Sequence, residues 1–307
     1  MAVNNTEFPF DALLPAEMAA KAEQIGVKKA RLNPVSMFVL AVLAGAFIAL
    51  GAIFSTTVVA GAGDALPYGV TRLLAGLVFS LGLILVIIGG AELFTGNNLI
   101  VMAWANRKVS TRLLLQNWMI VYLGNFVGAV GTAGLVYVSG QFAFGQGAVG
   151  AAALATANAK VGFDFLPAVA LGILCNALVC LAVWLTFSAR TTTDRILAIL
   201  PPITAFVAAG FEHSIANMYF IPIGLFIKAG APESFWAGIG QTAADFPALT
   251  WERFLINNLL PVTFGNIVGG ALLVGAVYWF VYLRQARSAA RADIRCEGEG
   301  ERRPELP

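Results

Sequence analysis

The stretch that decides the fold is Phe206–Ile221, FVAAGFEHSIANMYFI, which holds His213, the only histidine in the 307 residues. It lies inside an apolar run over 196–227. As one straight helix this run would measure about 48 Å, against about 30 Å of hydrocarbon in a bilayer. Polar groups at that depth usually face a cavity or a partner. The run therefore predicts a transmembrane helix broken at GFEHS, after Gly210, where the break lines a cavity.

The composition is that of a multi-pass membrane protein. Hydrophobic residues make up 59% of the chain and charged residues 12%, which is far from the balance of a soluble domain. A net charge of +2 gives no reason to expect a nucleic-acid partner. The three cysteines show neither a disulfide nor a zinc spacing, and no cofactor is predicted. No signal peptide is visible before the first long apolar stretch, which begins near Val35.

Six apolar spans divide the chain, and together they predict an all-α membrane protein with the spans 35–60, 70–106, 113–139, 165–188, 196–227 and 254–283. The second span is also too long, and ELFTGNN (Glu92–Asn98) interrupts it, so we predict a second broken helix. The alternative is a span followed by an interfacial loop. Residues 1–34 predict an amphipathic helix at the membrane surface or against the protein, or else a disordered tail. Residues 35–283 form the six-span domain, and the charged segment 284–307 predicts a disordered tail.

The two halves of the chain repeat. Asn117–Val138 (NWMIVYLGNFVGAVGTAGLVYV) matches Asn258–Trp279 (NLLPVTFGNIVGGALLVGAVYW) at nine positions at an offset of 141 residues. The third and sixth spans are thus equivalent. Three spans per half is an odd number, so the two repeats must be inverted in the bilayer. A GxxxG pattern in each copy allows close helix packing.

Lysine and arginine predict the orientation. With six spans both termini share one side, which carries 15 of the 19 basic residues; the other side carries Arg72, Lys160, Lys228 and Arg253. Basic residues gather on the cytoplasmic side of a membrane. Both termini are therefore expected to be cytoplasmic, in a prokaryotic inner membrane.

Four motifs resemble the formate/nitrite transporter family: GAELFTGNNLIVMA (Gly90–Ala103), NWMIVYLGNFVGA (Asn117–Ala129), AGFEHSIANM (Ala209–Met218) and NNLLPVTFGNIVGG (Asn257–Gly270). The resemblance runs from Phe8 to about Leu283. It implies an aquaporin-like fold with inverted repeats and a homopentamer in which each protomer has its own pore. The chain differs from the family pattern at Gly96–Asn98 and at Glu92, where an aspartate is common.

The resemblance also implies the pore residues. The family's central pair corresponds to Thr95 and His213, and its entrance lysine to Lys160. A pore-side asparagine corresponds to Asn176, and Glu212 is a candidate to tune the histidine. The apolar constrictions correspond to Phe79, Leu83, Phe94 and Phe206.

These residues suit the passage of a small anion. Stripping water from an anion in an apolar pore is costly. Lys160 can concentrate anions, and the N-termini of the half-helices after each break can point N–H groups at them. His213 can donate a hydrogen bond or a proton, with Thr95 as a second donor. The alternatives without the resemblance are a buried core residue for His213, lipid-facing phenylalanines and a solvated loop charge for Lys160. Phe94 and Phe206 each flank a break, which favours the pore for these two.

Formate is the expected substrate, favoured by the amino-terminal FPFDALLPAEMA (Phe8–Ala19), and nitrite or hydrosulfide is the alternative. An intramembrane enzyme is not expected. Glu212, His213 and Ser214 are consecutive, and side chains of helical neighbours diverge. A purely structural membrane protein would leave the two polar interruptions unexplained.

Overall fold

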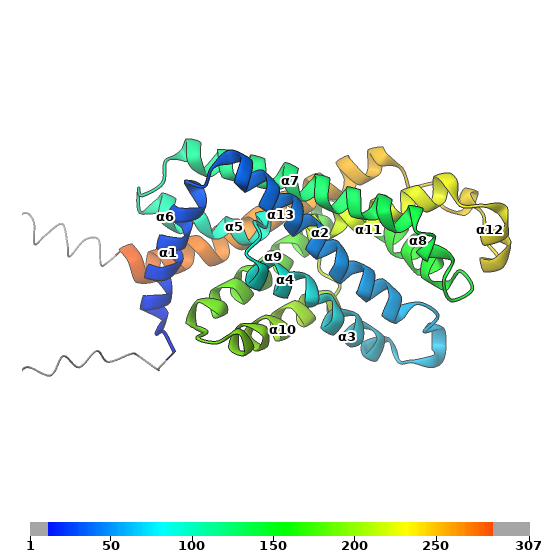
Figure 1. Cartoon of the computed structure of the whole chain (residues 1–307), viewed down its shortest axis with the longest axis horizontal. Coiled ribbons are helices and arrows are strands. Elements are labelled where there is room, and N and C mark those ends of the chain that lie inside the picture. Colours follow the sequence, from blue (N-terminus) through cyan, green and yellow to red (C-terminus); the bar gives the residue numbers. More distant parts are fainter. Residues whose placement is uncertain (1–11, 285–307) are drawn as a thin grey trace, which may run out of the picture.

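The structure is a computed structural model that describes residues 12–284, and every regular element within them is helical (Figure 1). The α-helices are α1 (Pro15–Ala30), α2 (Pro34–Val59), α3 (Tyr68–Phe79), α4 (Leu81–Gly89), α5 (Phe94–Asn97), α6 (Val101–Ala105), α7 (Thr111–Val138), α8 (Ala148–Val161), α9 (Phe165–Ser188), α10 (Thr192–Ala208), α11 (Ser214–Gly230), α12 (Glu233–Ile239) and α13 (Leu260–Ile267). Short 3₁₀ turns are η1 (Gly63–Ala65), η2 (Asn98–Ile100), η3 (Gln141–Ala143) and η4 (Ala243–Asp245).

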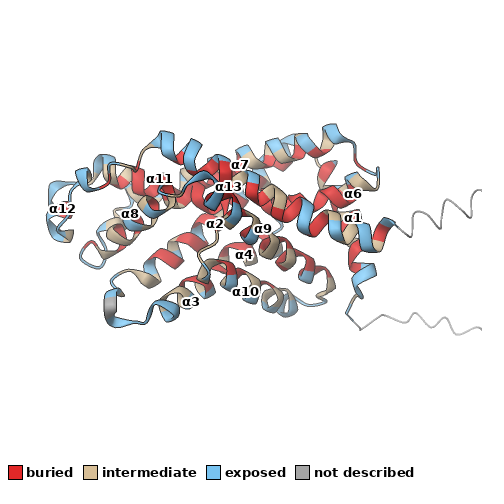
Figure 2. Ribbon diagram, turned by 180° about the vertical axis from the view of Figure 1, so that it is seen from behind, coloured by how far each residue is buried: buried red, intermediate tan, exposed pale blue. Residues whose placement is uncertain are grey.

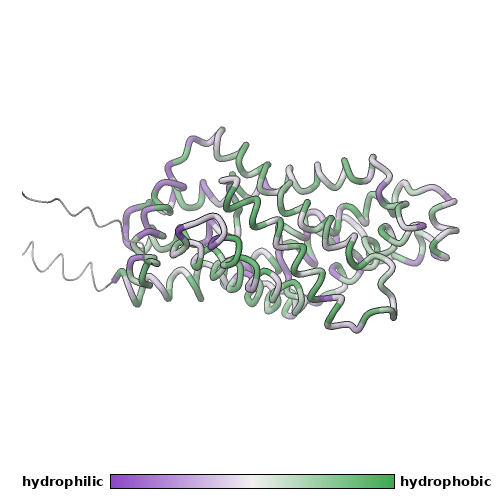
Figure 3. The backbone as a smooth tube through the Cα atoms, turned by 60° about the horizontal axis from the view of Figure 1, so that its bottom comes forward, coloured by the Kyte–Doolittle hydropathy of each residue, from purple (hydrophilic) through white to green (hydrophobic). Residues whose placement is uncertain are grey.

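The last span is one continuous helix over Arg253–Leu283. Within it, the π-type segment η5 (Arg253–Leu259) precedes α13. Two further π-type segments, η6 (Val268–Ala276) and η7 (Trp279–Leu283), follow it. Five helices of the described chain are long and apolar enough to cross a membrane, and the count reaches six if the bent pair α11 and α12 forms one span. Hydrophobic stretches fill the middle of the long axis and hydrophilic residues gather toward its ends (Figure 3). The predicted all-α membrane class is confirmed.

Both predicted breaks are present. The first half-helices α4 and α10 are followed by Gly90 and Gly210, whose φ angles are +79° and +78°. This left-handed conformation ends a helix and costs least at glycine. The second break is where GFEHS predicted it. The first comprises residues 90–93, and α5 begins at Phe94, so the interruption starts two residues earlier than ELFTGNN and ends within it.

The repeat predicted from the sequence packs in the same way in each half. A methyl group on Gly128 of α7 would lie 2.0 Å from the carbonyl oxygen of Val42 on α2. In the second half, a methyl group on Gly269 would lie 2.2 Å from the carbonyl oxygen of Ile173 on α9. The glycines therefore let each pair of helices approach at backbone distance, as the GxxxG patterns predicted.

The helix predicted within residues 1–34 is α1, and it packs against α6, η2 and the end of the last span (Figures 1 and 2). Its buried Glu23 forms a 2.5 Å ion pair with Lys108 and accepts a hydrogen bond from Asn106. Residues 1–11 and 285–307, including the predicted charged tail, lie outside the described residues. The division of the chain into three segments stays a prediction.

Two helices were not predicted. α8 and α12 lie at the end of the molecule opposite α1 (Figure 1). α8 has 14 residues, too few to cross a bilayer, and its alanine-rich sequence forms no long apolar run. It packs against α11, which places Lys160 at the mouth of the second broken span.

Candidate functional site

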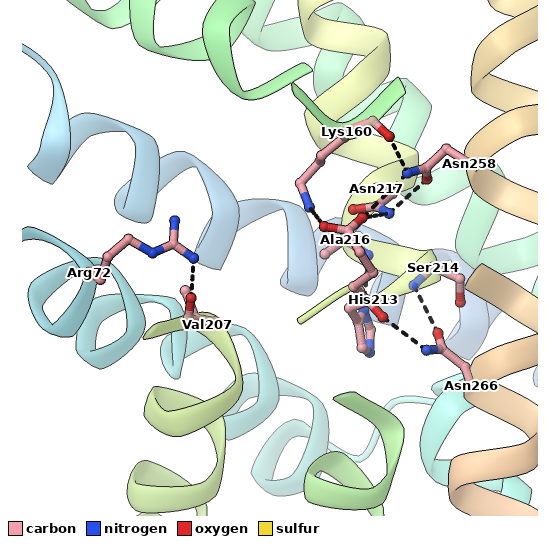
Figure 4. Close-up of polar contacts among 10 residues, drawn as sticks. Arg72, Lys160, Val207, His213, Ser214, Ala216, Asn217, Asn258 and Asn266 are labelled. Atoms are coloured by element: carbon pink, nitrogen blue, oxygen red, sulfur yellow. Dashed lines mark hydrogen bonds and ion pairs between the residues drawn. The ribbon is translucent and has the colours of Figure 1, made fainter. Parts of the chain in front are cut away.

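Two asparagines fix the loops at the two breaks. Asn125 donates hydrogen bonds to the carbonyl oxygens of Ala41 and Glu92, and its side-chain oxygen accepts the N–H of Phe94. Asn266 donates to the carbonyl oxygens of Gly172 and Glu212. Its side-chain oxygen accepts the N–H of Ser214 (Figure 4). The distances are all 2.8–2.9 Å. We call this pair the asparagine clamps.

The clamps form the interhelical hydrogen bonds that the repeat suggested. They also accept the first N–H of each second half-helix, that of Phe94 in α5 and that of Ser214 in α11. A third N–H, that of Ala216, donates to Nδ1 of His213 at 3.0 Å. The expectation that the half-helix N-termini point at a passing anion therefore does not hold for these three groups.

The two breaks bring Thr95 and His213 together. Thr95 Oγ1 lies 3.0 Å from His213 Nε2, and both side chains are buried. Because Nδ1 of His213 accepts the N–H of Ala216, the proton of the neutral ring is on Nε2 and donates to Thr95. The hydroxyl hydrogen of Thr95 is then available to donate to a third group.

A cavity of about 620 Å³ reaches His213 from the α8 end, and we call it the Lys160 cavity. Its lining includes Lys160, Glu212 and His213, together with Phe79 and Phe206. The rings of Phe79 and Phe206 meet edge to face with centroids 5.7 Å apart, and Phe206 stacks on the imidazole of His213 at 5.9 Å. Two of the four predicted constriction residues thus close this cavity beside the histidine.

A second cavity, of about 440 Å³, opens at the α1 end, and we call it the Lys29 cavity. Lys29, Glu92 and the predicted constriction residue Leu83 line it. Four of its lining side chains are basic, namely Lys21, Lys28, Lys29 and Arg195. Burial and the charges of Arg195 and Arg190 lower the pKa of Lys21, whose ammonium donates to the carbonyl oxygen of Phe187.

Three predicted residues, Thr95, Phe94 and Asn176, are absent from the lining of both cavities. Phe94 packs edge to face on Tyr122, with centroids 5.0 Å apart, and against Trp118. Asn176 is buried and donates to the carbonyl oxygens of Thr95 and Asn266, and to Oδ1 of Asn98. Asn176 therefore supports the loop that carries Thr95.

Lys160 is one member of a four-residue cluster around Glu212. Its ammonium lies 2.7 Å from Oε1 of Glu212, while the amide of Asn217 donates to Oε2 at 2.7 Å. Asn258 links the amide of Asn217 to the backbone carbonyl of Lys160 (Figure 4). The carboxylate of Glu212 is buried, and this network compensates its charge.

The same cluster occurs at the other cavity, and the sequence analysis missed it. Lys29 lies 2.8 Å from Oε1 of Glu92, and Asn97 donates to Oε2 at 2.7 Å. Asn117 links Asn97 to the backbone carbonyl of Lys29. The available signal was the shared spacing E-x4-N in the two breaks, together with the repeated Asn117 and Asn258. α1 is therefore the counterpart of α8, and each repeat has four parts rather than three.

Comparison with known proteins identifies the family to which this architecture belongs. The family model described as formate/nitrite transporter matches residues 16–280. The chain belongs to the formate/nitrite transporter family. It is 47% identical over 277 residues to the formate channel FocA of Escherichia coli K12, covering 90% of this chain and 97% of that one. It is 42% identical over 275 residues to FocA of Haemophilus influenzae, covering 90% and 96%.

A solved structure described as a pentameric formate channel with formate bound is 48% identical and has a TM-score of 0.78, covering 82% of this chain and 98% of that chain. The predicted family and the aquaporin-like fold with two inverted repeats are confirmed. Relatives of this family are channels and transporters, in keeping with the expectation that the chain is not an enzyme.

Proposed function

We propose that this chain is a formate channel of a prokaryotic cytoplasmic membrane, and that it passes formate as the anion or, with a proton, as formic acid. The observation that carries the proposal is the Thr95–His213 contact, enclosed between two cavities that each hold a lysine. The names of the two FocA relatives and of the formate-bound structure support formate as the substrate.

The charge pattern supports a sequence of steps for an anion. At either cavity a lysine raises the local anion concentration, although each is already paired with a carboxylate. Closer to the centre the anion loses water beside Phe79 and Phe206, where dehydration is costly. The hydroxyl of Thr95, polarised by Nε2–H of His213, donates to the substrate oxygen at that point. A hydrogen bond to a charged oxygen contributes about 1.5–3 kcal/mol.

The proposed central pair has a direct test. We expect His213→Phe to remove the pH dependence of formate flux in proteoliposomes, because Thr95 then loses its partner. Thr95→Ser, which keeps the hydroxyl, is the matched control and should retain the dependence. A His213→Phe protein with unchanged pH dependence would refute the proposed role. Measuring formate, nitrite and hydrosulfide side by side on the wild type then ranks formate against the alternative substrates of the family.

We also propose a homopentamer with one pore per protomer and both termini in the cytoplasm. The solved relative is described as pentameric, and basic residues are in excess at the α1 end; both observations support these proposals. Light scattering of the detergent-solubilised protein should give the mass of five protomers, and a stable monomer would contradict the assembly.

A further inference from the structure

The two mouths of the pore differ in net charge. Among the described residues, the Lys160 cavity is lined by two basic side chains, Arg72 and Lys160, and by one carboxylate, Glu212. The Lys29 cavity is also lined by a single carboxylate, Glu92, but its basic side chains are Lys21, Lys28, Lys29 and Arg195. The lining therefore has a positive excess of three charges at the α1 end and of one at the α8 end.

The carboxylate of the Lys29 cavity is already engaged. Glu92 accepts hydrogen bonds from the ammonium of Lys29 and from the amide of Asn97. Of the other three basic residues, Lys28 and Arg195 have side chains that form no hydrogen bond or ion pair with any described residue. Most of the excess charge therefore has no partner in the part of the chain that the structure describes.

The packing of α1 holds Lys21 near Arg195. The ammonium of Lys21, on α1, donates to the carbonyl oxygen of Phe187 near the end of α9 at 2.7 Å. Arg195 lies close to the N-terminus of α10, where the helix dipole adds positive potential. Burial and the charges of Arg195 and Arg190 lower the pKa of Lys21, which shows that these cations repel one another. An anion bound between them would relieve this repulsion.

The nearest carboxylate along the chain is committed elsewhere. Asp194 precedes Arg195, but it accepts the backbone N–H groups of Arg190 and Thr191 as part of the cap of α10. It is exposed and does not line the cavity. The cavity thus keeps its positive excess.

This arrangement suits an anion with more than one charge. A formate ion could balance only one of the unpaired cations, whereas a small multivalent oxyanion brings several charges and acceptor oxygens. A guanidinium donates two parallel N–H groups to such oxygens, and an ammonium provides a compact positive charge. The volume of about 440 Å³ also falls within the roughly 300–1,000 Å³ of small-molecule sites.

We infer that the Lys29 cavity contains a binding site for a dissolved multivalent oxyanion of the phosphate or sulfate type, formed by Lys21, Lys28 and Arg195. Leu83, a predicted constriction residue, lines the same cavity. A bound ion therefore lies in the path of formate and blocks its entry from the α1 end. The blocking effect rests on the proposed function, whereas the binding site does not.

Sulfate and methanesulfonate are matched probes for this site. Both present sulfonyl oxygens and neither titrates near neutral pH, but sulfate carries two charges and methanesulfonate one. Full-length protein in vesicles of phosphatidylcholine, a lipid without net charge, excludes anionic headgroups as the ligand. At constant ionic strength and on the α1 side, we expect sulfate to inhibit formate flux about tenfold more strongly than methanesulfonate, the effect of one additional charge-assisted hydrogen bond. On the α8 side the two probes should inhibit about equally.

The variant Arg195→Gln/Lys28→Gln removes the two cations that have no partner. We expect it to lose the preference for sulfate, with inhibition expressed relative to its own uninhibited flux. Arg112→Gln is the matched control, because Arg112 is an exposed cation at the same end of the molecule and does not line the cavity. It should keep the preference.

Calorimetry with sulfate on the detergent-solubilised full-length protein tests the site without formate. Saturable binding is expected in the wild type and in Arg112→Gln, and it should be lost in Arg195→Gln/Lys28→Gln. Binding in a protein that passes no formate would refute the proposed function and leave the site standing.

The absence of saturable sulfate binding in the wild type would overturn the inference while formate flux still supported the channel. Equal inhibition by the two probes on the α1 side would overturn it as well, and so would a preference for sulfate that persists in Arg195→Gln/Lys28→Gln. If that variant does not fold, the comparison of the two probes on the two sides of the wild type decides the matter.

Discussion

The two breaks share a scaffold but not a chemistry. Each ends its first half-helix at a glycine, is held by an asparagine clamp and carries E-x4-N beside a lysine. The residue after Glu92 is Leu93, however, whereas His213 follows Glu212. Thr95 likewise corresponds to Ile215. The repeat therefore gives the two loops the same position in their halves. The positions at which the two loops differ in sequence place Thr95 against His213 at the centre.

The largest effect should come from removing the shared scaffold. Asn125→Leu and Asn266→Leu each remove the hydrogen bonds to two backbone carbonyls and leave one buried N–H, that of Phe94 or Ser214, without its partner. At about 1–3 kcal/mol per unsatisfied group, either protein should fail to assemble or lose much of its thermal stability. Fluorescence-detected size exclusion with heating measures this loss.

Asn257→Leu is a suitable control for the clamp variants, because Asn257 precedes Asn258 on the same helix and is exposed. We expect the two clamp variants to be damaged to a similar extent. If one clamp is dispensable and the other essential, the two breaks are not structurally equivalent.

A smaller loss of stability should follow at the close helix contacts. Gly128→Ala and Gly269→Ala place a methyl group about 2 Å from a backbone oxygen, and overpacking of this kind costs roughly 1–3 kcal/mol. Gly131→Ala on α7 is the matched control, because a methyl group there meets no atom within 4 Å. Its melting temperature should equal or exceed that of the wild type. A normal melting temperature for Gly128→Ala would mean that the helices separate at little cost.

The smallest effect should come from the paired lysines. Removing a lysine alone would leave a buried carboxylate unpaired, so the informative variants are Lys29→Met/Glu92→Gln and Lys160→Met/Glu212→Gln. We expect each to slow formate entry from its own cavity a fewfold at low salt and less at high salt, because ions screen the field that a lysine projects from the cavity into solvent. Stopped-flow flux at two ionic strengths measures this. A loss that does not depend on salt would argue against attraction by these charges.

Much of this fold could be predicted from the sequence because the bilayer imposes lengths. The apolar runs over 70–106 and 196–227 exceed the hydrocarbon thickness, and Gly210 precedes the polar residues, so the breaks followed from geometry. The match between Asn117–Val138 and Asn258–Trp279 gave the inverted repeat. α8 was not predicted, because a helix too short to span a membrane produces no apolar run long enough to be recognised in the sequence.

The sequence by itself determined which spans break, which halves correspond and that Thr95 and His213 each lie at a break, because chain length and residue type are local properties. Only the tertiary structure decided that Thr95 Oγ1 and His213 Nε2 lie 3.0 Å apart, that Lys29 mirrors Lys160 and that the ammonium of Lys160 lies over the ring of Phe220. These relations join residues from different helices. They depend on how the helices pack and on which buried donor finds which acceptor.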